Sequence, residues 1–289
     1  MNTYTVSSKQ QRVDNSHMHY LDAGEGDPIL FLHGNPTSSF LWRNVIPHLT
    51  SHGRCIAVDL IGMGRSGKPD IDYYLVDHIN YVSAFVDALK LKNLTLVMHD
   101  WGVTIGLDFA KRHPERVKAV AFMEGHIHPV AKWEDFDEGS RTMFQQLRTE
   151  GVGQQMVIEN NFFIETILPA GTKRTLTAED MHAYRAPYLD KSARKPLWRW
   201  PNEIPIEGVP AAVTEIVANN QRYLAHTGIP KLLLYATPGA VLGTLEVAWC
   251  KETLSNLTAI DLGEGLHFLP EDHPEAIGAA LRAWLGRFT

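Results

Sequence analysis

The chain lacks the features that mark several specialised classes of protein. It has only two cysteines in 289 residues, Cys55 and Cys250, and no CxxC pair, so neither zinc nor redox chemistry is indicated. No apolar run approaches the length of a membrane span, and residues 1–22 lack the apolar stretch of a secretory signal. These absences predict a cytoplasmic protein, with both thiols buried in a reducing compartment.

The charge balance and the common ligand motifs exclude further classes. Twenty-seven basic residues against 33 acidic ones give a net charge of −6, so neither nucleic acid nor an anionic membrane is an expected partner. The segment Gly62–Gly67 matches GxGxxG, but Lys68-Pro69 follows it where a dinucleotide site would open a helix. We therefore predict a tight loop without NAD. There is no HExxH, EF-hand or P-loop motif, and we expect no metal and no cofactor.

Six short apolar runs are typical of strands buried on both faces of a parallel sheet. Each is nearly continuous in apolar character and partly β-branched. Segments with apolar residues at helical spacing lie between them. The alternation predicts a doubly wound α/β sheet. The predicted strands are 28–33, 54–59, 94–98, 118–123, 231–236 and 257–261.

Three of the intervening helices are marked most clearly. Residues 79–89 repeat apolar side chains at helical spacing, with Asp77 placed to cap the helix. A second helix is predicted over 101–112, and its two glycines four residues apart would let one face pack closely on the sheet. The third follows Pro274, a residue suited to the first turn of a helix.

The alternation of strands and helices stops between residues 126 and 225. This stretch is rich in aromatic residues, has helical periodicity with frequent prolines, and contains no convincing buried strand. We predict a mostly helical cap domain over 126–225, inserted above the carboxyl edge of the sheet. The core domain then consists of residues 1–125 and 226–289.

Asp100 stands between a predicted strand and a predicted helix, in the run Met98-His99-Asp100-Trp101-Gly102. This is the setting of a nucleophile elbow, a sharp turn that pushes one side chain into the active site. Gly102 fits the second small position of the motif, whereas Met98 departs from the first. A carboxylate is ionised at neutral pH and can displace a leaving group from saturated carbon without a base. The alternative is an aspartate that only caps the helix.

Several motifs in the same order resemble those of the haloalkane dehalogenases. They are His33–Ser39, Asp59–Ser66, His99–Gly102, Gly265–Phe268 and, in the insertion, Glu159–Phe163 and Trp200-Pro201. The resemblance spans nearly the whole chain. It implies an α/β-hydrolase fold with a mostly parallel sheet of eight strands and a helical cap after the sixth. It also implies hydrolysis of a small apolar haloalkane to a primary alcohol, a halide ion and a proton.

The resemblance further implies that Asn35 and Trp101 bind the departing halide and form the oxyanion hole. An amide NH₂ and an indole N–H are donors without a charge of their own, which suits a halide in a dry pocket. Their backbone N–H groups would stabilise the oxyanion when water attacks the ester. The alternatives are a turn residue before Pro36 and a core aromatic, and the position of both beside Asp100 makes these less favoured.

His267 is the predicted base among the 14 histidines. It lies after the last predicted strand and before the last helix, which fits the chain order nucleophile, acid, base. His273 precedes a proline at a helix start and resembles a surface residue. His99 adjoins the nucleophile but is expected to face the other side of the turn. His126 and His128 either line the mouth of the cavity or lie on the surface.

Glu124 is the predicted acid that orients His267. Many relatives place an aspartate after the seventh strand, but here 236–241 contain no carboxylate, and the next acid, Glu246, lies in a predicted helix. Glu124 ends the sixth strand, where a carboxylate is costly to bury unless it has a partner. The chain therefore resembles the subfamily whose acid is a glutamate at this position. The alternative is a solvated strand end.

The insertion supplies the predicted lining of the substrate pocket. Trp133, Phe144 and Phe163 are candidates, although most aromatic residues in such a segment belong to the core. Leu197-Trp198-Arg199 precede Trp200-Pro201 and depart from the family pattern, which leaves the shape of the pocket and the substrate range open.

Three other functions share parts of this pattern. An epoxide hydrolase uses the same nucleophile but needs cap tyrosines, for which Tyr184, Tyr188 and Tyr223 are available. A coelenterazine-oxidising luciferase of similar sequence shares nearly all the site residues. A non-catalytic receptor for a small ligand would use the same scaffold. The combination of site residues favours the dehalogenase.

Overall fold

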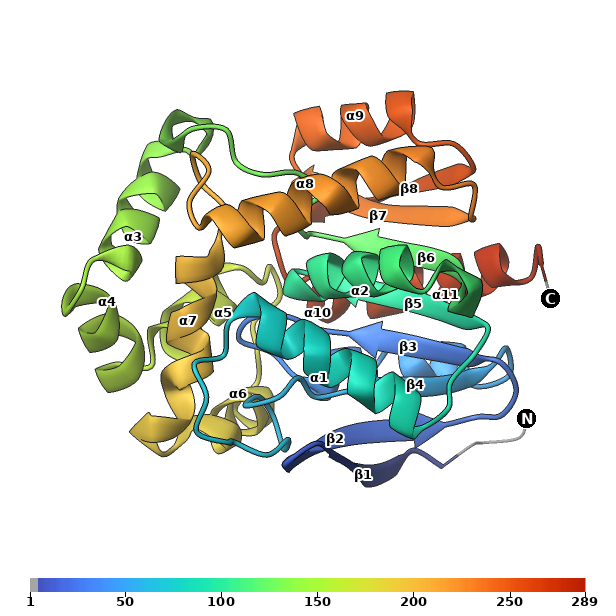
Figure 1. Ribbon diagram of the computed structural model, residues 1–289, viewed down its shortest axis with the longest axis horizontal. Helices are drawn as coiled ribbons and strands as arrows, with labels where there is room; N and C mark the ends of the chain where they lie inside the picture. The colour runs from blue at the N-terminus through green and yellow to red at the C-terminus, as the bar shows by residue number, and fades with distance from the viewer. Residues whose placement is uncertain (1–4, 289) are drawn as a thin grey trace.

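The centre of the protein is one eight-stranded sheet, seen in a computed structural model that describes residues 5–288. The strand order is β1-β2-β4-β3-β5-β6-β7-β8 (Figure 1). Strands β3 to β8 run parallel, whereas β2 is antiparallel to both of its neighbours. The predicted mostly parallel sheet is confirmed. The strands are β1 Ser7–Val13, β2 Ser16–Ala23, β3 Pro28–Leu32, β4 Arg54–Val58, β5 Leu94–His99, β6 Val117–Met123, β7 Lys231–Pro238 and β8 Leu257–Gly265.

The six apolar runs correspond to β3 through β8, whereas β1 and β2 were not predicted from the sequence. These two strands form a hairpin whose turn is Asp14-Asn15, and β1 is the edge strand. Only one residue of β1, Val13, is buried. An antiparallel edge strand can face water, so it needs no continuous apolar run. Its polar residues also discourage pairing with another chain.

Helices cover both faces of the sheet. Helices α1 (Leu75–Ala88), α2 (Trp101–Arg112) and α8 (Ala211–His226) lie on the near face, and α11 (Pro274–Leu285) lies behind (Figure 1). Each layer encloses its own apolar core. The helices predicted over 101–112 and after Pro274 are confirmed.

The predicted role of Asp77 at the start of α1 needs a correction. The helix begins at Leu75, so Asp77 lies inside its first turn rather than in front of it. There its carboxylate accepts a hydrogen bond from the backbone N–H of Tyr74, at 2.9 Å. A negative side chain at this position satisfies a free donor at the helix end and complements the helix dipole.

The motif Gly62–Gly67 forms the predicted tight loop. The backbone N–H of Gly62 donates to the carbonyl of Gly67 at 2.9 Å, which closes the loop on itself. The N–H of Arg65 donates to the Asp59 carboxylate at 2.8 Å. No helix opens at the motif, since α1 begins only at Leu75.

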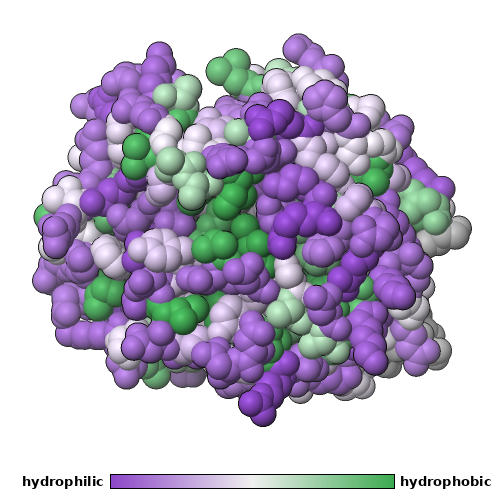
Figure 2. Space-filling model, viewed as in Figure 1, coloured by the Kyte–Doolittle hydropathy of each residue, from purple (hydrophilic) through white to green (hydrophobic). Residues whose placement is uncertain are grey.

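The insertion after β6 is helical and stands at the end of the sheet toward which the arrowheads of β3 and β6 point (Figure 1). Figure 2 shows hydrophobic residues gathered near the centre of this face, where the insertion meets α2 and α8. Its elements are α3 Glu138–Arg148, α4 Val152–Gln154, the π-helical turns Gln155–Glu159 and Phe163–Ile167, α5 Leu168–Ala170, α6 Ala178–Arg185 and α7 Lys195–Glu203.

Helix α8 packs with the core rather than with the helices of the insertion. It lies along α2, and the Asn220 side chain donates to the carbonyl of Thr104 at 2.9 Å. We therefore propose that the cap ends near residue 210, earlier than the boundary at 225 predicted from the sequence. Every helix within residues 5–288 is too short or too polar to span a bilayer.

Candidate active site

Asp100 occupies a strained turn between β5 and α2. Its backbone has a φ of 53° and a ψ of −128°, and its side chain is buried. A non-glycine residue in the left-handed region is uncommon, and such residues cluster at functional sites. Two glycines make the turn possible. A Cβ on Gly34 would lie 2.2 Å from Asp100 Oδ2, and one on Gly102 would lie 2.3 Å from the carbonyl oxygen of Leu32.

Met98, the departure from the usual elbow pattern, is accommodated by a second glycine of α2. The side chain of Met98 is buried against the helix, and a Cβ on Gly106 would lie only 2.3 Å from its sulfur. Because Gly106 has no side chain, there is room for Met98 at a position where the usual motif has a small residue. The two glycines of α2 allow the predicted close packing on the sheet.

The structure brings the predicted nucleophile, base and acid together. His267 Nδ1 lies 3.3 Å from Glu124 Oε2, and His267 Nε2 lies 3.8 Å from Asp100 Oδ1. The second distance exceeds that of a direct hydrogen bond. The three side chains come from the ends of β5, β6 and β8, at the carboxyl edge where a parallel sheet places its active site.

Glu124 is held by the loop after β7, the position where many relatives have an aspartate. The carboxylate is fully buried and accepts hydrogen bonds from the backbone N–H groups of Ala240 and Val241, both at 2.9 Å, and of Leu242, at 3.4 Å. Glu246, the other acid considered, lies on α9 (Thr244–Thr253), and its carboxylate is 3.5 Å from His128 Nε2. The loop after β7 therefore provides N–H donors for the acid rather than the acid itself.

The charges of the site shift the pKa values of its members. Burial raises the pKa of Asp100, and this effect exceeds the opposing influence of His267 and of the N–H groups of Asn35 and Trp101. For His267, burial opposes the imidazolium. The hydrogen bond with Glu124 and the negative charges of Asp100 and Glu124 nevertheless hold the pKa of His267 above its ordinary value.

The Asp100→Asn substitution is expected to lower the pKa of the His267 imidazole, because it removes a negative charge that favours the imidazolium. A histidine ring titration followed by NMR in both proteins measures this shift. His128 is the internal control, because its raised pKa depends on Glu246 and not on Asp100. An unchanged or higher pKa of His267 in the variant would contradict the assigned coupling.

Asn35 and Trp101 lie beside the predicted nucleophile, Asp100, as their positions in the sequence indicated. The backbone N–H of Asn35 donates to Asp100 Oδ2 at 2.6 Å. Among the described residues, no group accepts a hydrogen bond from Asn35 Nδ2 or from Trp101 Nε1, and Asn35 Oδ1 is buried without a partner. Two side-chain donors without a protein acceptor, beside a buried carboxylate, suit an anion that arrives during the reaction.

The indole of Trp101 is part of an aromatic stack that the sequence did not reveal. Its ring lies 4.8 Å from that of Trp200, which lies 4.2 Å from that of His78, and both pairs are stacked. Trp200 is fully buried, and its Nε1 donates to the sulfur of Met63 at 3.3 Å. Helix α7 of the cap thereby fixes the orientation of the Trp101 ring.

Two further histidines, His99 and His126, lie beside the site. His99, set aside as facing away, is buried with its ring 4.8 Å from that of His267, and its Nε2 bonds to the carbonyl of His267 at 2.8 Å. His126 lies 5.7 Å from the Trp101 ring, and burial together with nearby histidines lowers its pKa to about 4. The only indication in the sequence that His99 lies at the site was its position next to Asp100.

The predicted pocket residues lie in the cap, in two groups. Trp133 and Phe144 both pack against Phe136, at ring distances of 6.0 and 5.3 Å. Phe163 begins a π-helical turn, is buried, and packs against Phe162. Their contact with a substrate stays a prediction.

Within the described residues, none of the three tyrosines considered for an epoxide hydrolase forms a hydrogen bond with Asp100. The hydroxyl of Tyr184 donates to Glu271, and the ring of Tyr188 lies 5.8 Å from Lys68 Nζ. The Tyr223 hydroxyl is buried without a partner, on α8 of the core. Across residues 5–288, no three His, Cys, Asp or Glu side chains are grouped so as to hold a metal ion.

Comparisons with known proteins agree on one family. A sequence model of the α/β-hydrolase fold matches residues 27–153. A haloalkane dehalogenase of Mesorhizobium japonicum is 49% identical over 273 residues, covering 93% of this chain and 88% of the relative. One from Sphingobium indicum is 45% identical over 276 residues, covering 93% and 92%. The crystal structure of a haloalkane dehalogenase from Bradyrhizobium elkani superposes with a TM-score of 0.96 at 42% identity, covering 98% of each chain.

Proposed function

The chain belongs to the haloalkane dehalogenases of the α/β-hydrolase fold, and from that premise we propose that it hydrolyses haloalkanes through an ester formed on Asp100. One observation carries the proposal. A buried carboxylate stands at the elbow, with a backbone N–H on one oxygen and His267, paired with Glu124, beside the other. Such a carboxylate attacks without a base, and the histidine is then free for a second step.

The first step is displacement of the halide. Asp100 Oδ2 is held by the N–H of Asn35, so Oδ1 is the attacking atom. It forms a bond to the halogen-bearing carbon while the carbon–halogen bond breaks and the halide leaves with the electron pair. The unpaired donors Trp101 Nε1 and Asn35 Nδ2 stabilise the leaving anion, and the stack with Trp200 holds the indole in place.

The second step is hydrolysis of the ester. His267 Nε2 takes a proton from a water molecule, which attacks the carbonyl carbon of the alkylated Asp100. Oδ2 becomes the oxyanion and stays within reach of the Asn35 N–H. Collapse breaks the bond to the alkoxide, which takes the proton of the added hydroxyl and leaves as the alcohol, so that the carboxylate is restored. His267 returns its proton to solvent. Between proton uptake and proton release, the Glu124 carboxylate stabilises the His267 imidazolium.

Alkylation itself prepares His267 for this second step. The free carboxylate of Asp100 helps to hold the pKa of His267 high. Esterification removes that charge, so the pKa of the imidazole falls at the moment when it must be neutral to accept a proton. The hydrolytic step therefore speeds up as pH rises through the pKa of His267 and is lost as pH falls below it.

Bromide release from a panel of bromoalkanes, with alcohol identified as the second product, tests the proposed function. We expect one bromide and one alcohol for each substrate consumed. Epoxides and coelenterazine are offered in parallel under the same conditions. Turnover of either without bromide release from any bromoalkane would overturn the dehalogenase assignment, and binding of a bromoalkane without turnover would favour a receptor.

A further inference from the structure

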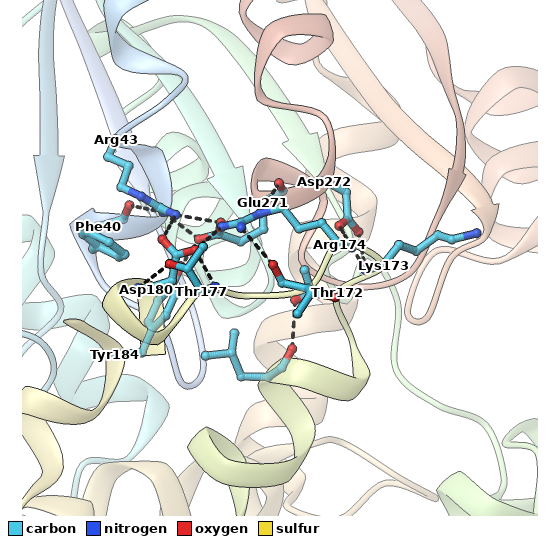
Figure 3. Close-up of polar contacts among 12 residues, drawn as sticks. Phe40, Arg43, Thr172, Lys173, Arg174, Thr177, Asp180, Tyr184, Glu271 and Asp272 are labelled. Atoms are coloured by element: carbon cyan, nitrogen blue, oxygen red, sulfur yellow. Dashed lines mark hydrogen bonds and ion pairs between the residues drawn. The ribbon is translucent and has the colours of Figure 1, made fainter. Parts of the chain in front are cut away.

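A partly buried ionic cluster joins the cap to the segment that carries His267. We name it the cap latch; its members are Arg43, Arg174, Asp180, Tyr184 and Glu271 (Figure 3). Glu271 lies in α10 (Leu269–Asp272), which begins two residues after His267. Arg43 follows the 3-10 turn Ser39–Trp42 of the core, whereas Asp180 and Tyr184 belong to α6 of the cap.

Glu271 is the centre of the latch. Its side chain is fully buried, and its two oxygens accept bonds from Arg43 Nη1 at 2.6 Å and Nη2 at 2.9 Å. Arg174 and the hydroxyl of Tyr184 donate to the same carboxylate. Asp180 accepts from Arg43 at 2.8 Å and from Arg174 at 2.9 Å, so two cations face two anions. A fully buried carboxylate such as that of Glu271 is tolerated only with such pairing.

The backbone of the cap reinforces the same junction. The N–H groups of His267 and Phe268 both donate to the carbonyl of Gly171, at 3.1 and 3.0 Å. In return, the N–H groups of Lys173 and Arg174 donate to the Asp272 carboxylate, at 3.0 and 2.9 Å. The segment 171–174 thus runs along 267–272, and the base is held from the cap as well as by His99 from below.

Asp100 and Trp101 are held independently of the latch. Asp100 is fixed by the turn between β5 and α2, and Trp101 by its stack with Trp200 on α7. Neither contact involves a member of the latch. A change at Glu271 would therefore displace the base while leaving Asp100 and Trp101 in place.

We propose that Glu271 is a positioning residue that sets His267 through α10 and the segment 171–174, so that it governs ester hydrolysis and not carbon–halogen cleavage. This inference rests on the proposed function. General-base catalysis requires the imidazole within hydrogen-bond reach of the water, and a displacement of about 1 Å costs about 10²-fold in rate. The cap thereby acts on the second half-reaction as well as enclosing the substrate.

The experiment separates the two half-reactions in Glu271→Gln by rapid-quench measurement of bromide from a bromoalkane. We expect a burst of one bromide per folded protein at an unchanged rate, followed by steady-state turnover lowered about 10- to 100-fold. The alkylated protein should accumulate, visible as an increase in the intact mass. Tyr184→Phe, which removes one donor and no charge, should give a smaller slowing of the same step.

Glu165→Gln is the matched control. Glu165 also forms a two-pronged pair with an arginine of the cap, Arg185, but on the surface and away from His267. Its substitution should leave both phases unchanged. Thermal melting accompanies each variant, and if Glu271→Gln does not fold, Tyr184→Phe decides.

Three results would overturn the inference. Equal slowing of the burst and of the steady state would mean that the latch acts on both steps. A smaller burst with an unchanged rate per active site would mean that it only stabilises the fold, and unchanged turnover would mean that it does not position His267. Bromide release by the wild type in any of these cases leaves the proposed function standing. Its absence from the wild type refutes the proposed function and the inference that rests on it.

Discussion

Asp100→Asn lowers bromide release from bromoalkanes by at least about 10⁴-fold, which is the expected cost of removing a nucleophile. The amide has the shape of the carboxylate but carries no charge, so it cannot displace the halide. The elbow geometry should survive, because the Asn35 N–H can still donate to the amide oxygen. Bromide release and intact mass measure the effect, and the mass also reveals any hydrolysis of the new amide back to aspartate.

Asp108→Asn provides the matched control for this substitution. Asp108 lies in α2, the helix that follows Asp100, is similarly buried, and pairs with Lys111 and Arg112 at the far end of that helix. Loss of its negative charge should lower the stability of α2 slightly and leave bromide release near the wild-type rate. Comparable release by Asp100→Asn, with the amide intact by mass, would place the reaction at another residue.

The parts of this molecule that were predictable from sequence are those governed by local patterns. Continuous apolar runs revealed β3 to β8, because strands buried on both faces admit few polar residues. The edge strand β1 has no such constraint and was missed. The start of α1 was predicted after Asp77, later than its actual start at Leu75, because an aspartate suits both the cap and the first turn of a helix.

The site followed the same rule. Asp100 and Glu124 were indicated by their positions at strand ends, and His267 by its position after the last strand. The residues that hold them were not indicated. The donors to Glu124 are backbone N–H groups of 240–242, which any side chains would provide equally.

Long-range packing accounts for the remaining omissions. The stack of Trp101 on Trp200 and the pairing of Arg43 with Glu271 join segments that are far apart in the chain. No spacing rule connects such segments, so a single sequence gives no sign of them. The same holds for the packing of α8 on α2, from which we propose that the cap ends near residue 210.

His267→Gln should convert the protein into one that reacts once. Alkylation needs only the carboxylate of Asp100 and the halide donors, whereas hydrolysis of the ester needs a base. We expect one bromide released per protein at close to the wild-type rate, and then turnover lowered about 10²- to 10⁴-fold, the usual contribution of general-base catalysis. Rapid-quench bromide measurement gives the burst, and intact mass followed by peptide mapping places the alkyl group on Asp100.

His273→Gln is the control, because His273 lies on the same segment and its ring Nε2 is bonded to the carbonyl of Glu264, at 2.7 Å. It should turn over normally. Continued turnover by His267→Gln would mean that another group serves as the base, and the buried His99 beneath it is the nearest candidate. Absence of the burst would mean that His267 is needed for carbon–halogen cleavage itself. Either result would break the division of labour between Asp100 and His267 on which the two-step mechanism depends.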